Sequence, residues 1–311
     1  MAATKISDVI VPEVFNDYVI QATTEKNAFI KSGIAVSDPS VSLTDGGKTV
    51  VIPFFKEIDA NVEGLSDTNA LAVNNISSDK DVAAIHARGI AFGCNDLAKL
   101  FSGADPMLAI AKQVTNIWDR DFQKVALASL KGIFGLASLR DSISDQSANV
   151  LDAKMMSDAL FLLGDSYNKI SAVAFHSKVL AHLKNLDLVD SVQPSTLEPG
   201  YYTYMEKRVI VDDSLTPVDG VYPIYFFGAG ALSYNENNTL ASVETDRDIL
   251  AGNDVLTSRR VFTMHPRGVR WIGVPAGATP SLDELALSTN WELAENRKNV
   301  AISLLKAKLD I

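Results

Sequence analysis

The sequence predicts an α+β fold, in which one long helix and several long strands are combined with a separate group of short alternating elements. Three features of the 311-residue chain lead to this prediction. A long amphipathic pattern follows residue 105, a pair of strand-like runs is separated by a long polar excursion, and short helical and extended runs fill residues 136–235. A chain of this length buries one large core or two smaller ones.

The first segment of the chain has its own pattern. Residues 5–33 place apolar side chains at roughly helical spacing, and Gly33 ends the run. We interpret this segment as an N-terminal arm that stands apart from the elements that follow it.

The polar excursion between the first two strands is the most informative feature. Residues 49–55 and 82–92 have strand patterns, but residues 56–80 separate them, where a hairpin connection normally has about two to five residues. The excursion is acidic and rich in Asn, yet it carries spaced apolar residues that a disordered linker would lack. These residues are Ile58, Val62, Leu65, Leu71, Val73 and Ile76. We expect an extended loop that packs on another copy of the chain, with Ile58, Leu65 and Leu71 as tentative contacts.

A long helix is predicted next. Asp105-Pro106 combines an N-cap residue with proline at the first helical position. Proline lacks an N–H, but an N–H at this position would have no hydrogen-bond acceptor within the helix. Apolar residues then recur every three or four positions as far as Ala126, and Gly132 is the predicted end. The helix would be about 39 Å long at about 1.5 Å per residue.

Shorter elements follow the helix. Residues 153–163 and 178–186 have helical patterns, and residues 171–175, 201–204, 208–211 and 221–227 have strand patterns separated by Gly and Pro. This region is interpreted as a compact domain inserted into the first one. Two long strands, residues 239–244 and 259–271, are then expected to return to the long helix.

Several segments, taken in order, resemble the major capsid proteins of tailed double-stranded DNA bacteriophages. The resemblance rests on Asn95-Asp96-Leu97-Ala98, Gly103-Ala104-Asp105-Pro106-Met107, Ile117-Trp118 and Lys131-Gly132-Ile133-Phe134 in the first half. In the second half it rests on residues 245–254, Arg259-Arg260, residues 265–271, Asn290-Trp291-Glu292-Leu293 and Lys298-Asn299-Val300. Together these segments span nearly the whole chain.

This resemblance implies a division of the chain. Residues 1–35 would be the N-terminal arm, 36–92 the extended loop, 93–135 a peripheral domain with a spine helix, and 136–235 an axial domain. Residues 236–275 would supply the return strands of the peripheral domain, and 276–311 a C-terminal segment.

The resemblance also implies partners. Copies of the chain would form the hexamers and pentamers of an icosahedral virion shell, assembled in the host cytoplasm, that encloses double-stranded DNA without reading its sequence. Scaffolding, portal and decoration proteins are further expected partners. Binding to a membrane is not expected. Some relatives crosslink a loop lysine to a neighbour, but nothing marks Lys56 or Lys80, the only lysines of the excursion, as reactive.

A charged group near residue 250 is the second set of tentative inter-subunit contacts. Its members are Glu244, Asp246, Arg247, Asp248, Asp254, Arg259 and Arg260. We interpret them as interface salt bridges that set the register between subunits more than the affinity. The plainer interpretation is a solvated strand rim. No histidine or nucleophile lies near these carboxylates in the sequence.

Composition argues against several other classes of function. The formal net charge of −10 opposes dedicated nucleic-acid binding, because neutralising phosphates requires clustered Lys and Arg. The single cysteine, Cys94, excludes an internal disulfide, and the four histidines lack metal-ligand spacing. We therefore predict no catalytic site, no cofactor and no metal.

Two alternatives stay open on the sequence. An encapsulin-type bacterial nanocompartment shell would have the same fold around an enzyme cargo. A soluble α/β hydrolase would need a convergent Ser/His/Asp site, with His176 or His265 as the candidate base.

Overall fold

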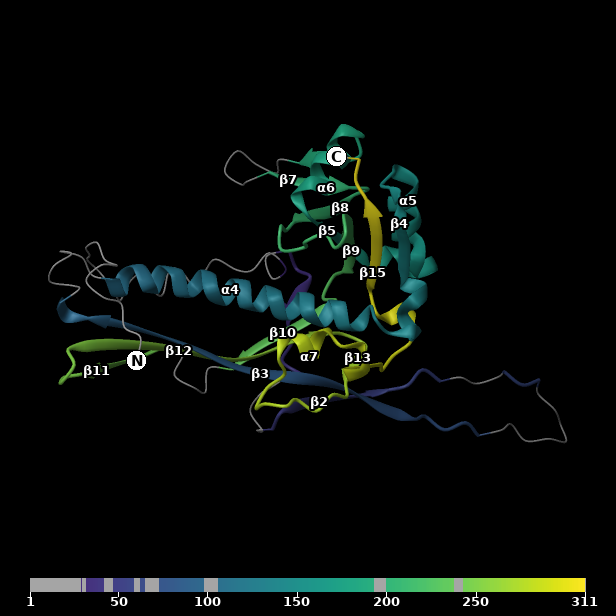
Figure 1. Cartoon of the computed structure of the whole chain (residues 1–311). Helices are drawn as coiled ribbons and strands as arrows, with labels where there is room; N and C mark the ends of the chain where they lie inside the picture. Colours follow the sequence, from purple (N-terminus) through teal and green to yellow (C-terminus); the bar gives the residue numbers. More distant parts are fainter. Residues whose placement is uncertain are drawn as a thin grey trace.

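The computed structural model describes residues 29, 32–41, 47–58, 62–64, 73–97, 106–192, 200–237 and 243–310, with only the backbone of 106–109, 111, 112 and 115. Two large β-sheets, a two-stranded sheet and one long helix form its body, and a hairpin projects far from that body at one end (Figure 1). This mixture of helix and strand agrees with the predicted α+β class.

The first sheet joins segments from both halves of the chain. Its strands are β1 (Ala35–Ser37), β2 (Thr49–Phe55), β3 (Ser78–Asn95), β10 (Leu232–Asn237), β11 (Val243–Asp248) and β12 (Asn253–Pro266). Their order is β1-β10-β12-β3-β2, and β11 pairs with β12. The predicted strands 49–55 and 82–92 are confirmed, the second as part of the longer β3.

The predicted return strands differ from the observed ones in extent. The strand expected over 259–271 begins earlier, at Asn253, and breaks after Pro266. Gly268 has a positive φ of 82° at this break, and β13 (Val269–Trp271) follows as a separate strand. Of the strand expected over 239–244, Val243 and Glu244 open β11, and residues 239–242 lie outside the described residues.

Helix α4 (Pro106–Ile133) lies across one face of this sheet (Figure 1). It begins at the predicted proline, although Asp105 lies outside the described residues. Trp118 is buried and donates its Nε1–H to Ser258 Oγ on β12 at 2.9 Å. Phe122 meets Phe262 edge to face, with the ring centroids 4.4 Å apart. The predicted apolar helix face therefore packs on the sheet.

Gly132 does not end α4, contrary to the sequence prediction. The helix continues to Ile133, and Gly132 is where a neighbouring element makes its closest approach. A Cβ atom at this position would lie 2.1 Å from Leu285 O and 2.6 Å from Trp291 Nε1. The glycine is therefore required by packing rather than by a turn.

A second sheet lies beyond the other side of α4. Its strands are β4 (Ile143–Val150), β5 (Ile170–Phe175), β6 (Asp190–Val192), β7 (Tyr201–Tyr204), β8 (Lys207–Val211), β9 (Val221–Gly228) and β15 (Ile302–Lys308), in the order β4-β15-β9-β5-β8-β7-β6. Helices α5 (Ala153–Leu160) and α6 (Ser177–Asn185) and the 3-10 segments η2 (Ala137–Ser142) and η3 (Phe161–Lys169) accompany it. The strands predicted for this region are confirmed.

Alternate residues of the central strands face different cores. Ala174, Phe227 and Leu304 join the core around α4, whereas Val173, Phe226 and Leu305 join a second core with α5 and α6. Both faces of the second sheet are therefore covered.

The strand pairing joins segments that the expected division assigns to different parts of the chain. Within 276–311, β15 lies inside the second sheet between β4 and β9. Within the range expected for the axial domain, β10 pairs with β12 in the first sheet. Residues 36 and 37, expected in the extended loop, belong to β1, which pairs with β10. Pairing between residues so far apart leaves no local signal in the sequence.

A small unit connects the two sheets. It contains α7 (Leu282–Ala286), η4 (Ser288–Asn290), β14 (Trp291–Leu293) and η5 (Arg297–Asn299). Trp271 of β13 packs edge to face on Trp291 of β14 at 5.1 Å. Ser281 and Glu284 form a capping box at the start of α7.

The Gly132→Ala substitution tests the packing role of this glycine. Alanine would favour the helix by about 1 kcal/mol if Gly132 only reduced helix propensity. Because the added methyl group meets Leu285 O, we expect a loss of about 1–3 kcal/mol in unfolding free energy instead. Urea denaturation of the dissociated subunit measures this change. Lys131→Ala, on an exposed neighbouring position, is the control, and a stabilised Gly132→Ala variant would contradict the packing role.

The second prediction concerns His86, which is buried on β3 against Phe262. Burial, and then the charge of Arg88, lowers the pKa of His86 from 6.5 to about 3. Between these values only the unfolded chain binds the proton. The contribution of neutral His86 to the unfolding free energy is therefore complete above pH 6.5. It falls toward pH 3, by up to about 1.4 kcal/mol per pH unit. Urea denaturation between pH 7 and 4 should show this slope, and His86→Leu should flatten it. An unchanged slope would refute the assignment.

Candidate functional site

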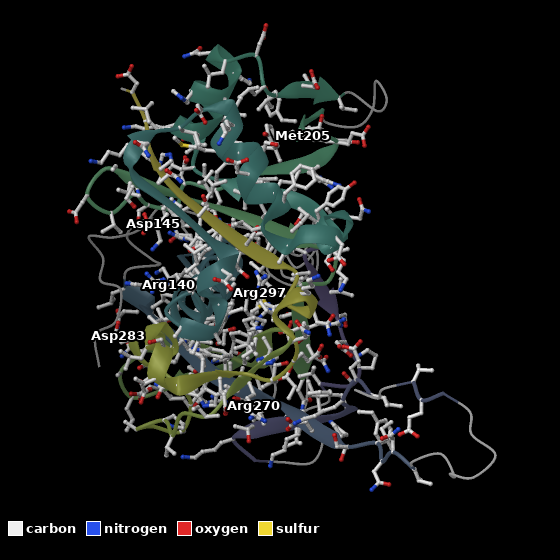
Figure 2. All side chains as sticks on the ribbon, turned by 90° about the vertical axis from the view of Figure 1, so that its right-hand side faces the viewer. Arg140, Asp145, Met205, Arg270, Asp283 and Arg297 are labelled. Carbon is white, nitrogen blue, oxygen red and sulfur yellow. The ribbon has the colours of Figure 1, made fainter. Side chains whose placement is uncertain are left out.

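The projecting hairpin is the most exposed part of the described chain. Strands β2 and β3 pair from Thr49↔Ala84 to Phe55↔Ser78, and the hairpin points away from the body (Figure 2). We call described residues 55–58, 62–64 and 73–77 the distal loop. Leu65 and Leu71, two of the predicted contacts, lie outside the described residues.

Large apolar side chains of the distal loop face solvent. Ile58, the third predicted contact, is 59% exposed, and four others are similar or higher: Phe55, Val62, Val73 and Ile76. Exposing this much apolar surface on one narrow projection is unfavourable in water. A chain that functions with these residues buried needs a partner to cover them.

Charged side chains anchor the base of the hairpin to the body. Asp79 of β3 accepts from Lys56 Nζ at 3.0 Å and from Arg270 Nη1 at 2.9 Å. Arg270, labelled in Figure 2, also donates from Nε to Glu292 Oε2 at 3.0 Å. The Lys80 backbone N–H, followed by the bond from Lys56, lowers the pKa of Asp79 to about 2. This group of ion pairs connects the residue that follows β2 with β3, β13 and β14.

A second anchor lies two residues along β3. Asp81 is buried, and its Oδ1 lies 3.0 Å from Nε2 of the buried His265 at the end of β12. Its Oδ2 accepts the Gly268 N–H at 3.3 Å. His265 also stacks on Trp291 with the ring centroids 6.1 Å apart, and only 1% of its side chain is exposed.

The charged group near residue 250 forms a hairpin whose charges pair within the chain. Arg247 of β11 donates to Asp254 Oδ1 of β12 at 2.8 Å and also to Asp96. Asp248 Oδ1 accepts the N–H groups of Leu250 and Ala251, which shapes the turn between the strands. Asp246 is exposed beside them.

The remaining arginines of this group are also paired. Arg259 pairs with Glu244 across β11 and β12, and both side chains are about half exposed. Arg260 donates to Glu236 Oε1 at 3.0 Å and lies over Trp118 at 5.6 Å, with only 18% of its side chain exposed. Contacts to another subunit therefore stay a prediction for Asp246, Arg247, Asp248, Asp254, Arg259 and Arg260, and Arg260 exposes only a small part of its side chain.

Sequence reasoning missed two residues at the tip of this hairpin. Ile249 and Leu250 are 82% and 100% exposed. They lie between charged residues, and the sequence prediction used only the charges. Two adjacent large apolar residues in an acidic turn are nevertheless a signal of a contact surface. They give the molecule a second apolar tip, distinct from the distal loop.

The other candidate base has a local structural role. His176 Nδ1 accepts the Lys178 N–H at 3.1 Å and so caps α6. In the described part of the chain, no cluster of His, Cys, Asp or Glu is suited to a metal ion. None of the helices described there has the length and apolar character that a membrane crossing requires.

Replacing Arg270 tests the anchor at the hairpin base. Arg270→Met keeps the length of the side chain but removes the pairs with Asp79 and Glu292. We expect amide hydrogens of residues 49–55 and 78–84 to exchange several-fold faster, because the hairpin opens more often. The neighbouring Arg267→Met is the control, since Arg267 pairs with Asp38 instead.

The pH dependence of the same measurement follows from Asp79. Its lowered pKa means that the unmodified chain should keep its hairpin protection from pH 7 to about 4 and lose it as the pH falls toward 2. Equal exchange in the unmodified chain and Arg270→Met would show that the ion pairs do not hold the hairpin.

Comparison with known proteins gives a family for this geometry. The pattern of the Gp13-like family, described as major capsid protein 13-like, matches residues 13–301. The major capsid protein of Bacillus phage SPP1 is 39% identical over 322 aligned residues, which cover 99% of each chain.

Solved structures share the fold at low sequence identity. The capsid of a native GTA particle has a TM-score of 0.57 at 11% identity, covering 96% of this chain and 93% of that one. A Mycobacterium phage Cain structure has a TM-score of 0.56 at 8% identity, covering 100% and 99%. The SrpI encapsulin of Synechococcus elongatus has a TM-score of 0.54 at 9% identity, covering 100% and 94%. On the full-length match, the chain belongs to the Gp13-like family of major capsid proteins.

Proposed function

We propose that copies of this tailed-phage major capsid protein form hexamers and pentamers in which each subunit lays its extended loop on the next. The observation that carries the proposal is the set of exposed apolar side chains on the distal loop of a capsid-family chain. They supply a contact surface that the subunit itself does not cover.

The loop contact would be head to tail. A contact of this kind joins one patch to a different patch on the next copy, and it closes into a ring when the rotation allows. Burying Ile58 would contribute roughly 1.5–3 kcal/mol, and Leu65 and Leu71 would add to it. Six or five copies in a ring would repeat the gain at each junction.

The charged hairpin would set the register of such contacts. Asp246, Arg247, Asp248 and Asp254 lie near the turn that carries the exposed Ile249 and Leu250, so apolar burial and charge matching would act together at this tip. Arg259 pairs with Glu244 at the other end of the same hairpin. Arg260, held beneath the surface, would support the hairpin from within. Exposed pairs of this kind contribute about 0–1 kcal/mol each, so they would select a geometry more than strengthen it.

The acidic composition would suit a container for DNA. A net charge of −10 avoids the tight binding that a cationic lining would impose on packaged double-stranded DNA. A strongly basic interior face in the assembled shell would count against this idea. Scaffolding, portal and decoration proteins would join the copies during assembly in the host cytoplasm.

Electron microscopy of the purified chain tests the proposed function. Round particles of uniform diameter are expected, and particles carrying an enzyme cargo without phage DNA in the native host would favour the encapsulin alternative. A chain that stays monomeric at high concentration would refute both.

Ile58→Asp tests the contribution of the distal loop. Since Ile58 is exposed in the subunit, the unfolding free energy should change by no more than about 0.5 kcal/mol. Particle yield, measured by sedimentation, should fall strongly because a charge enters the buried contact. Val218→Asp is the matched control, at a residue 68% exposed in the loop before β9. Equal yields from both variants would remove the distal loop from the contact.

A further inference from the structure

In its described part the chain passes between the two large sheets three times. Residues 134–142 lead from α4 to β4, residues 229–231 lead from β9 to β10, and residues 294–301 lead from β14 to β15. The angle between the sheets therefore depends on how these segments are held to one another. We call the three segments together the joint.

Arg297, labelled in Figure 2, fastens the third segment of the joint to the first. Its Nη1 donates to Asp141 O at 3.1 Å and to Ser142 Oγ at 3.3 Å, both in η2. It also lies 3.4 Å from Leu162 O in η3. Carbonyl groups near the end of a helical turn carry partial negative charge, which favours a guanidinium group there. One side chain thus holds three separate pieces of backbone together.

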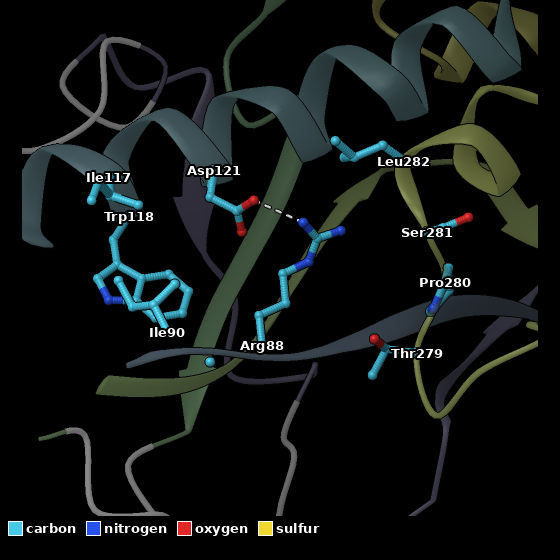
Figure 3. A pocket seen from close by; sticks show the side chains of 10 residues that line it. Arg88, Ile90, Ile117, Trp118, Asp121, Thr279, Pro280, Ser281 and Leu282 are labelled. Carbon is cyan, nitrogen blue, oxygen red and sulfur yellow. Dashed lines mark hydrogen bonds and ion pairs between the residues drawn. The ribbon is translucent and has the colours of Figure 1, made fainter. Parts of the chain in front are cut away.

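The acceptors of Arg297 are all uncharged, which distinguishes it from arginines such as Arg88. Across a cavity of about 510 Å³ between β3 and α4, Arg88 pairs with the carboxylate of Asp121 at 2.7 Å (Figure 3). The bonds described for Arg297 go to two carbonyl groups and a hydroxyl group. A cation gains from such neutral groups only where they converge on it. The position of Arg297 therefore reports the geometry of the joint.

The third segment of the joint is also tied to the second. The Gly228 N–H donates to Ala301 O at 2.7 Å, where β9 ends and residues 229–231 begin. A Cβ atom on Gly228 would lie 2.6 Å from Ala301 Cβ and 3.0 Å from Lys169 O. The two segments therefore approach too closely for a side chain at position 228.

The start of the third segment is held on the first sheet. Gly268 O, at the break between β12 and β13, accepts the N–H groups of Ala294 and Glu295 at 3.0 and 3.1 Å. Val300 is 1% exposed and belongs to the core around α4. Residues 294–301 are thus bound to the first sheet at one end and to η2, η3 and β9 at the other.

Both sheets carry exposed apolar side chains that the subunit leaves uncovered. On the first sheet these are the distal loop and the Ile249–Leu250 turn, and around the second sheet Phe161, Leu186 and Met205 are each nearly half exposed. Copies that contact their neighbours through both sheets join at a rotation that depends on the angle between the sheets. A closed ring requires the same rotation at every junction.

We propose that Arg297 is a positioning residue for assembly. By holding residues 294–301 against η2 and η3, it fixes the angle between the two sheets, and this angle sets the diameter of the shell. This inference rests on the proposed function and names the residue that determines the geometry of the particle.

Arg297→Met tests the assignment. Methionine keeps an apolar stem of similar thickness but removes the hydrogen bonds to η2 and η3. Several angles between the sheets then become populated, so the particles should differ in diameter. In electron micrographs, the fraction of particles with the diameter of those from the unmodified chain should fall at least about fivefold.

Arg88→Met is the control for a general loss of stability. The bond from Arg88 to Asp121 joins β3 to α4 and does not involve the joint. Urea denaturation of the dissociated subunits measures how much stability each variant loses. Arg88→Met should form fewer particles, but particles of unmodified diameter. The same result from Arg297→Met would show that Arg297 only stabilises the subunit, and it would overturn the inference.

Gly228→Ala keeps the test decisive if Arg297→Met fails to fold. Its added methyl group meets Ala301 Cβ and pushes the second and third segments of the joint apart, so the particle diameter should again vary. The double variant Gly228→Ala/Ala301→Gly removes the atom that the methyl group meets, and it should restore part of the uniform population. Uniform particles of unmodified diameter from Gly228→Ala would overturn the inference.

Failure of the inference is distinguishable from failure of the proposed function. An unmodified chain that stays monomeric would refute both. Uniform particles from the unmodified chain and from Arg297→Met would refute only the role of Arg297. Varied diameters in both Arg297→Met and Arg88→Met would also refute it, because the diameter would then follow stability rather than the joint.

Discussion

The backbone hydrogen bonding of β3 is the constraint on which the rest of the structure depends. One continuous strand, Ser78–Asn95, pairs with β2 in the projecting hairpin and with β12 in the body. A strand that belongs to both parts cannot bend freely where one pairing gives way to the other. The direction in which the hairpin leaves the body is therefore set by the same ladder that builds the first sheet.

Side chains also stabilise the direction of the hairpin, close to where the pairing of β3 changes from β2 to β12. Asp79 and Asp81, two residues apart on one strand face, reach Arg270 and His265 at the break between β12 and β13. Lys56 and Glu292 are about half exposed, so solvent screens their attraction to Asp79 and Arg270, whereas Asp81 and His265 are buried and gain from a low dielectric. The buried pair is costly to break, and the surface pairs add geometric restriction around it.

Helix α4 gives this hairpin a rigid support. It packs on the first sheet through Trp118 and Phe122, and it shares a core with one face of the second sheet. Its approach to α7 at Gly132 leaves no room for a Cβ atom. The distal loop and the Ile249–Leu250 turn are therefore two exposed apolar tips on one packed support.

Many elements of this fold could be predicted from short sequence patterns. The helix start at Pro106, the strands at 49–55 and 221–227, and the exposed loop between the first two strands follow from patterns within a few residues. Such patterns report burial and backbone propensity, which are properties of neighbours along the chain. The resemblance to capsid proteins likewise needed only residue order.

Tertiary structure alone decided the positions of β15 and β10 and the close packing at Gly132. The final strand Ile302–Lys308 lies between β4 and β9, and nothing near residue 302 indicates those partners. The local sequence pattern predicts that Gly132 ends the helix, whereas the structure shows that Gly132 allows a close contact with neighbouring elements. Strand pairing and close packing join residues that are distant along the chain, so sequence patterns a few residues long do not contain them.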